Sequence, residues 1–212
     1  MPNILTDQKR IWLFPFTAVT TGHGLIPAIG VVGATAGLVA LDPVDTPYFR
    51  RTKFFHSFDH VFDNGNTELA TILIPAAFYG VGFLRKDSYA QQTALLAGEA
   101  VADSEILNEA AKITSRRLRP NSIDPHGDFD DAWFKSGLGN SGFFSGHTVA
   151  AVAIATVFAR RYGSHRWVPF VAYGLAGAIA ISRITLSQHF PSDVFLGAAL
   201  GYSISRFAVL RP

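Results

Sequence analysis

The longest uncharged run in the sequence, residues 11–41, is the feature that most limits how this chain folds. It contains no Asp, Glu, Lys or Arg, and its second part, residues 25–41, is rich in Val, Leu and small residues. A helix needs about 20 predominantly apolar residues to cross a bilayer. A secretory signal peptide is the rival interpretation, but no A-x-A-like cleavage site follows a short apolar core. The run therefore predicts a membrane-spanning helix.

Five further segments read as helices: 69–84, 90–115, 148–159, 167–182 and 191–210. Strand-like alternation and internal repeats are not apparent, which favours an all-α fold. We expect one domain, residues 1–212, built as a single bundle of about six helices that spans a membrane and carries its site at one end. The segment 90–115 argues for a soluble bundle instead, because acidic residues interrupt it and such a helix does not face lipid all round.

Composition excludes several classes of function. The formal net charge is +2 and the chain has no Lys/Arg-rich run, so nucleic acid is not an expected partner. The chain has no cysteine, which rules out disulfides, thiolate catalysis and Cys-ligated metal. Hydrophobic residues make up 49% of the chain, a value between those of soluble and strongly membrane-embedded proteins.

Arg183, His189 and Asp193 lie within twelve residues of one another in otherwise apolar sequence. Charge among apolar neighbours is costly unless it is paired. We expect Asp193 to accept a hydrogen bond from Nδ1 of His189, leaving Nε2 outward as a nucleophile or base. Arg183 then remains to bind an anion. Pro191 suits a first helical turn, so His189 is expected in a connector and Asp193 just inside a helix.

Two upstream segments carry further polar groups. Lys112 and Arg119 are two helical turns apart and are expected on one face, with Pro120 ending the helix. Arg116 and Arg117, between them, are expected to be flanking or headgroup-facing charges. Ser145-Gly146-His147 precedes an apolar run, so Ser145 is expected as an N-cap whose helix start binds an anion. On its own this tripeptide equally fits a cap followed by a surface histidine.

The connectors show no metal site. His56 and His60 are four residues apart, but no third ligand is positioned, and we interpret them as solvated residues in a connector over 42–66. The loop after Pro120 has several aspartates but lacks the glycine and terminal glutamate of a calcium loop. We expect a solvated lid that offers aromatic side chains to an apolar substrate or a membrane: Trp133, Phe134, Phe143 and Phe144.

Three ordered motifs together resemble the signature of the type 2 phosphatidic acid phosphatase superfamily, which vanadium-dependent haloperoxidases share. They are Lys112-x6-Arg119-Pro120, Ser145-Gly146-His147 and Ser182-Arg183-x5-His189-x3-Asp193. Phe144 departs from the family pattern, which usually has proline before Ser-Gly-His.

The resemblance implies a role for each matching residue. His189 would attack phosphorus to give a phosphohistidine, Asp193 would orient it, and His147 would protonate the leaving alkoxide. The phosphoryl oxygens would be bound by Lys112, Arg119, Ser145, Gly146 and Arg183. Metal and cofactor would not be required.

The resemblance leaves alternatives open. A membrane-spanning enzyme would act on a lipid-borne phosphate such as phosphatidate, phosphatidylglycerol phosphate, a polyprenyl pyrophosphate or a lipid A phosphate. A soluble periplasmic acid phosphatase would hydrolyse small phosphomonoesters. A haloperoxidase would hold vanadate as its cofactor on His189, although such relatives tend to be much longer chains. A non-catalytic bundle is disfavoured because His147, His189 and Asp193 are all present.

The basic residues predict an orientation in a bacterial inner membrane. With six spans and a cytoplasmic N-terminus, the positive-inside rule places the site on the periplasmic side. The cations then expected on the cytoplasmic side are Lys9, Arg10, Arg85, Lys86, Arg160, Arg161, Arg166 and Arg211. Those that count against this orientation are Arg50, Arg51 and Lys53.

Overall fold

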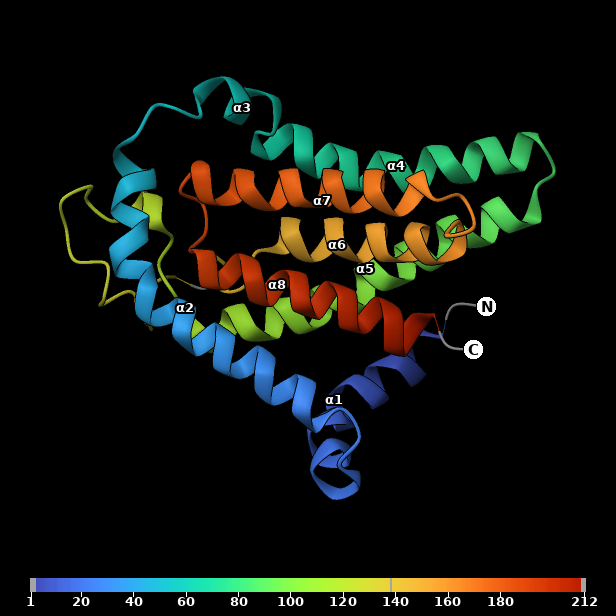
Figure 1. Ribbon diagram of the computed structural model, residues 1–212, viewed down its shortest axis with the longest axis horizontal. Coiled ribbons are helices and arrows are strands. Elements are labelled where there is room, and N and C mark those ends of the chain that lie inside the picture. The colour runs from blue at the N-terminus through green and yellow to red at the C-terminus, as the bar shows by residue number, and fades with distance from the viewer. Residues whose placement is uncertain (1–2, 138, 211–212) are drawn as a thin grey trace.

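The chain folds into a bundle of α-helices in the computed structural model, which describes residues 3–137 and 139–210 (Figure 1). Eight α-helices lie within these residues: α1 Ile4–Thr21, α2 Leu25–Arg51, α3 His56–Val61, α4 Asn64–Leu84, α5 Ser88–Ser115, α6 Gly146–Arg161, α7 Trp167–Thr185 and α8 Pro191–Ser203. A 3-10 turn, η1, covers Pro120–Ser122, and a π-helical turn, η2, covers Ile204–Val209. The expected all-α bundle is confirmed.

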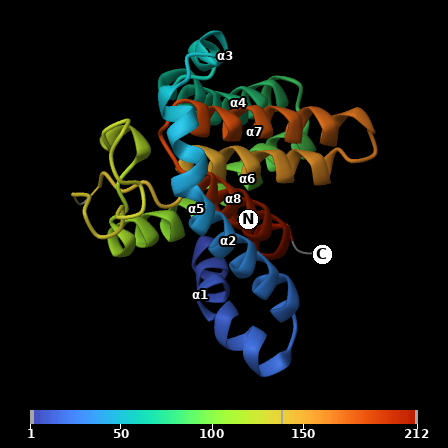
Figure 2. The ribbon, with the colours of Figure 1, turned by 60° about the vertical axis from the view of Figure 1, so that its left-hand side comes forward.

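The first apolar run is divided into two helices. Gly22 and Gly24 both have positive φ, at 72° and 76°, a conformation that glycine adopts without steric cost. The chain turns there, so α1 and α2 form a hairpin that extends from the bundle (Figure 2). In addition, α2 continues to Arg51. Asp42, expected at the start of a connector, therefore lies inside a helix.

Helix α6 forms the centre of the bundle and packs against α5, α7 and α8. Most of its residues are buried, from Thr148 to Val157 without a break. Its contact with α8 is close because α8 presents glycine there: a Cβ at Gly201 would come within 2.4 Å of the Val149 carbonyl oxygen. This short apolar helix is thus enclosed by other helices of the bundle.

Three helices of the described chain, α2, α4 and α7, are long and apolar enough to cross a membrane. They expose large apolar side chains such as Ile26, Leu73 and Phe170. Three candidate spans are fewer than the six considered from the sequence, because α6 and α8 are short and α5 is polar. The acidic Glu99 and Asp103 of α5 are buried against other helices.

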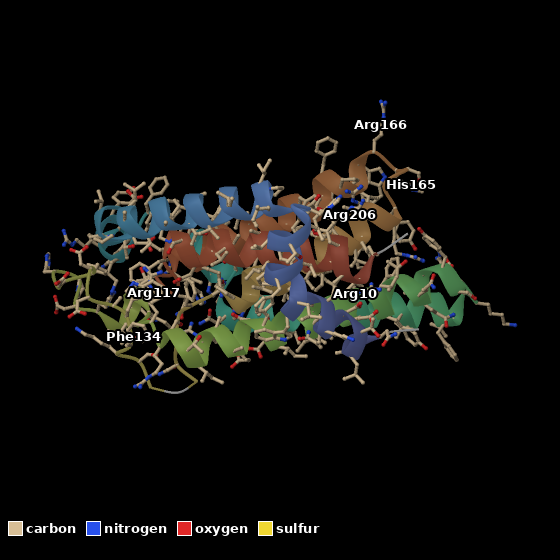
Figure 3. All side chains as sticks on the ribbon, turned by 90° about the horizontal axis from the view of Figure 1, so that it is seen from below. Arg10, Arg117, Phe134, His165, Arg166 and Arg206 are labelled. Atoms are coloured by element: carbon tan, nitrogen blue, oxygen red, sulfur yellow. The ribbon has the colours of Figure 1, made fainter. Side chains whose placement is uncertain are left out.

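The three motif segments meet at one end of the bundle, on the left in Figure 1. Helix α5 ends there, α6 begins there, and α7 passes into α8 there (Figure 1). The start of α4 lies at the same end. Arg117 lies at this end in Figure 3, whereas His165 and Arg166 of the α6–α7 turn lie at the other.

Candidate active site

His189 lies in the connector between α7 and α8 and is 3% exposed. Its Nδ1 is 2.7 Å from the carbonyl oxygen of Gly142. A carbonyl oxygen only accepts hydrogen bonds, so Nδ1 carries the proton and Nε2 has the lone pair. Burial, followed by the nearby Arg119, lowers the pKa of His189 well below its usual value. The imidazole is therefore held neutral with an unprotonated Nε2, as a nucleophile requires.

Asp193 does not pair with His189, which corrects the contact expected from the sequence. Its Oδ1 is 2.7 Å from Nη1 of Arg117, and its Oδ2 accepts a hydrogen bond of 2.9 Å from the backbone N–H of Phe190. The reason is local: α8 begins at Pro191, so Asp193 in the first turn satisfies an N–H at the helix start. The predicted tautomer of His189 is retained, but the Gly142 carbonyl selects it.

Arg183, near the end of α7, is completely buried. Its Nη1 donates a hydrogen bond of 2.6 Å to Oδ1 of Asn64, and its Nη2 donates hydrogen bonds to the backbone carbonyls of Phe62 and Asp63. Within residues 3–137 and 139–210 it has no ion pair. Its guanidinium is thus held by neutral oxygens, and the carboxylates of Asp63 and Asp59 act on it only from beyond ion-pair distance. Nothing in the sequence signals this contact with the residues at the start of α4.

Arg119 reaches the site from the connector after α5, and its Nη1 donates a hydrogen bond of 3.2 Å to Oε1 of Gln188. The expectation that Lys112 and Arg119 share a helix face is wrong. Helix α5 ends at Ser115, and Arg116 turns the chain with a φ of 44°. Lys112 instead forms an ion pair of 2.6 Å with Glu109 on its own helix.

Ser145 is the N-cap of α6, as expected, although its side chain makes no capping hydrogen bond. Its Oγ accepts a hydrogen bond of 2.9 Å from the hydroxyl of Thr148. Gly146 follows where α6 approaches α5: a Cβ there would lie 3.0 Å from Nδ2 of Asn108. The absence of a side chain therefore lets the helix start come close to α5, with its first backbone N–H groups available to an anion.

His147, in the first turn of α6, has an unpartnered and buried Nε2 within the described part of the chain. Burial first, and then Arg183, lower the pKa of His147. A general acid must carry a proton, which a lowered pKa disfavours. His147 therefore becomes a better proton donor only when a bound anion offsets the neighbouring cations. The unpartnered Nε2 is consistent with a polar ligand that the protein alone does not supply.

The site thus combines two imidazoles and two guanidinium groups. His189 is influenced by Arg119, His147 and Arg183. His147 is in turn influenced by Arg183 and Arg119. Two cations and a helix start around a neutral imidazole suit a dianion such as a phosphoryl group.

The lid differs from the solvated segment that was expected. Its aspartates 124, 128, 130 and 131 are exposed, but Ile123, Phe129 and Ala132 form a buried cluster with Phe190. Arg117, expected to be a headgroup-facing charge, is only 2% exposed and lies under the Trp133 ring. Phe134 remains 69% exposed. The lid is therefore a packed wall of the site with one outward aromatic side chain (Figure 3).

Carboxylates that could hold a metal ion lie away from this site. Asp7, Glu99 and Asp103 have oxygen atoms within 4.8 Å of one another, between α1 and the middle of α5. His56 and His60 are exposed on α3. Neither group contacts the imidazoles of the site in the described residues.

Comparison with known proteins gives a consistent result. A family model described as the PAP2 superfamily matches residues 93–211, more than half of the chain. A lipid A 1-phosphatase of Porphyromonas gingivalis is 37% identical over 93 residues, which are 43% of this chain and 18% of that protein. A lipid A 1-phosphatase of Rhizobium johnstonii is 31% identical over 101 residues, 48% of this chain and 40% of that protein. The matches span less than half the length of these relatives.

The fold also has a counterpart among solved structures. The crystal structure of the first transmembrane PAP2 type phosphatidylglycerolphosphate phosphatase from Bacillus subtilis superposes with a TM-score of 0.50 at 20% identity. The superposition covers 93% of this chain and 92% of that one.

Proposed function

This chain belongs to the PAP2 superfamily, and we propose that it is a membrane phosphatase that removes phosphate from a lipid-borne substrate through a phosphohistidine on His189. The observation that carries this proposal is the environment of His189. The ring is buried and neutral, its Nδ1 is fixed by the Gly142 carbonyl, and Arg119 and Arg183 are beside it. A neutral nucleophile beside two arginines that make no ion pair within the described residues is suited to phosphoryl transfer.

The proposed reaction has two steps. Nε2 of His189 attacks phosphorus, the bond from phosphorus to the leaving oxygen breaks, and His147 gives its proton to that oxygen. Water then attacks phosphorus, His147 takes a proton from the water, and the P–N bond breaks to release inorganic phosphate and restore His189. Arg119, Arg183 and the backbone N–H of Gly146 would bind the phosphoryl oxygens.

Ser145 and Lys112 would complete the oxyanion contacts. The Ser145 hydroxyl lies at the start of α6 and already accepts a hydrogen bond from Thr148, so its own proton is available to a phosphoryl oxygen. Lys112 would have to leave Glu109 to reach the substrate. An ion pair at the surface is weak, so this exchange costs little.

An apolar groove between the α3 region and α7 supports a lipid substrate. Phe55 and Phe58 of the α3 region face Tyr173 and Ile181 of α7 across this groove. Ile181 is in the last turns of α7, as Arg183 is, but the two side chains point to different sides of the helix. The groove therefore offers an acyl chain an apolar surface at this end of α7 without reaching the arginine itself. Lipid A and phosphatidylglycerol phosphate, on which the similar proteins act by name, are both lipid-borne phosphates.

We propose that the site faces the periplasm. The α4–α5 and α6–α7 turns, with Arg85 and Arg166, lie at the end opposite the site (Figures 1 and 3). Arg50 and Arg51, which count against this orientation, donate hydrogen bonds to the lid carbonyls of Asn121 and Pro125. These two cations have a structural reason to be on the site's side, which supports the positive-inside assignment. Arg211 lies outside the described residues.

The test is phosphoenzyme trapping with His189→Ala. We expect the purified wild-type protein to release phosphate from a panel of lipid phosphates and from p-nitrophenyl phosphate, and to be labelled by a ³²P substrate after quenching in alkaline detergent, because a phosphohistidine is stable in alkali and hydrolysed in acid. His189→Ala should lose both signals, and EDTA should change neither. The matched control is His165→Ala, an exposed histidine at the other end of the bundle. Turnover by a folded His189→Ala protein would contradict the mechanism.

A further inference from the structure

Arg117 is a buried cation to which the proposed reaction gives no role. It lies in the connector after α5, and two carboxylates bind its guanidinium. Nη2 is 2.6 Å from Oδ2 of Asp42, and Nη1 is 2.7 Å from Oδ1 of Asp193. All three side chains are at most 2% exposed. Buried ion pairs fix geometry when their remaining donors and acceptors are also satisfied.

Ser192 adds further hydrogen bonds to this network, in which Nε of Arg117 alone has no partner among the described residues. Its hydroxyl is 2.8 Å from Nη1 of Arg117 and donates to Oδ2 of Asp42. Its backbone N–H donates a hydrogen bond of 3.2 Å to Oδ1 of Asp42. Asp42 thus holds both Arg117 and the first turn of α8, although it comes from α2, 150 residues away and outside the matched residues 93–211.

Two aromatic rings fix the plane of the Arg117 guanidinium. Its Cζ is 4.4 Å from the centroid of the Trp133 ring and 3.9 Å from that of Phe190. Stacking of this kind is a property of arginine that lysine does not reproduce. The guanidinium is therefore held by charges in its plane and by rings at its faces.

Arg117 is connected to His189 by two short routes. In the first, the backbone carbonyl of Arg117 accepts a hydrogen bond of 2.8 Å from the N–H of Gly142, and the carbonyl of Gly142 in turn accepts one from Nδ1 of His189. In the second, Asp193 binds Arg117 through one oxygen and the N–H of Phe190 through the other. Phe190 directly follows His189. The first route runs through the Arg117 main chain and the second through its guanidinium, so the ring partner of His189 and the backbone beside it both connect to Arg117.

We infer that Asp42 and Arg117 are positioning residues, which fix the direction of the His189 ring through Gly142 and Asp193. The inference rests on the proposed function, because it concerns the nucleophile of that reaction. It also assigns a catalytic purpose to a charged residue in α2, a helix long and apolar enough to span a membrane. Neither side chain contacts the substrate in this scheme.

The kinetic test compares two charge-neutralising changes on the same helix. Asp42→Asn should lower kcat about 10- to 100-fold, the cost of a misplaced catalytic group, and should change KM by less than about twofold because substrate contacts are intact. Asp45→Asn removes the same charge from an exposed position one turn later and should change neither constant. Ser192→Ala is a milder variant that should give a smaller loss of kcat if Asp42→Asn does not fold.

Rescue separates geometry from charge. Arg117→Lys keeps the charge but not the two-sided fork or the stacking, so it should not restore kcat above the level of Arg117→Gln. A purely electrostatic role would make the lysine variant nearly normal. Normal kcat in folded Asp42→Asn, or a rise in KM with kcat unchanged, would overturn the inference.

An NMR measurement tests the same inference without turnover. In ¹⁵N-histidine-labelled protein, the His189 Nδ1 proton signal is assigned by its loss in His189→Gln. We expect Asp42→Asn to shift or broaden this signal, whereas Asp45→Asn leaves it in place. An unmoved signal would refute the positioning role even if the wild-type protein released no phosphate. Wild-type inactivity combined with a shifted signal would refute only the proposed function.

Discussion

Two buried arginines at the same end of the bundle, Arg117 and Arg183, have different partners. Arg117 binds the carboxylates of Asp42 and Asp193. Arg183 binds the amide oxygen of Asn64 and backbone carbonyls. The carboxylates pair directly with Arg117, whereas Arg183 is held by neutral oxygens and has carboxylates, Asp63 and Asp59, only beyond ion-pair distance, which leaves its donors more available to an anion. The difference separates an arginine that builds the site from one that is suited to bind phosphate.

The largest expected effect tests the phosphate-binding half of this comparison. Arg183→Ala should lower kcat/KM about 10³-fold or more, because a single donor to a developing oxyanion already accounts for about 10²- to 10³-fold. Steady-state phosphate release would measure it, with exposed Arg166→Ala at the other end of the bundle as the control. A loss of less than about tenfold would mean that Arg183 is a structural residue like Arg117.

Stability should rank the two arginines in the reverse order. Arg117→Ala leaves two buried carboxylates without their cation and should destabilise the fold by on the order of 3 kcal/mol or more. Arg183→Ala leaves neutral acceptors unpaired and should cost about 1–3 kcal/mol. Denaturant unfolding in detergent, monitored by tryptophan fluorescence, would compare them. Equal losses would show that the carboxylates do not distinguish the two sites.

Converting one environment into the other is a sharper test. Asn64→Asp places a carboxylate on Arg183 in nearly the same shape and should compete with the phosphoryl group. We expect KM, and the inhibition constant of inorganic phosphate, to rise about tenfold or more, the scale of a close buried charge pair. Asn64→Ala is the matched control, since it removes the same contact without adding charge and should have a smaller effect. Equal effects of the two changes would argue against an Arg183 whose donors are available to an anion.

The sequence predicted the superfamily, the all-helical fold and the local frame of the site. Ser145 does precede α6, and Pro191 does begin α8. These features depend on neighbours within a turn of helix, which a sequence shows directly. The motif spacing identified the superfamily because three short patterns in order are specific.

The partners of the site residues could not be predicted in the same way. Asn64 lies 119 residues from Arg183, and Asp42 lies 150 residues from Ser192. Neither belongs to a motif. His189 binds a backbone carbonyl, a group that every residue type carries, so no side chain signals it. Arg116 and Arg117 differ only because Arg116 turns the chain, which directs its neighbour inward.

The smallest expected effect is a shift of the pH profile. Burial and then Arg119 lower the pKa of His189, and a cation does so because it disfavours the imidazolium. The reactive form is neutral, so activity is lost as the pH falls through that pKa. In Arg119→Gln the pKa of His189 should rise towards its usual value, and the acid limb of kcat/KM should move to higher pH. Asp45→Asn should leave the limb in place, and a limb unmoved in Arg119→Gln would mean that burial alone keeps His189 neutral.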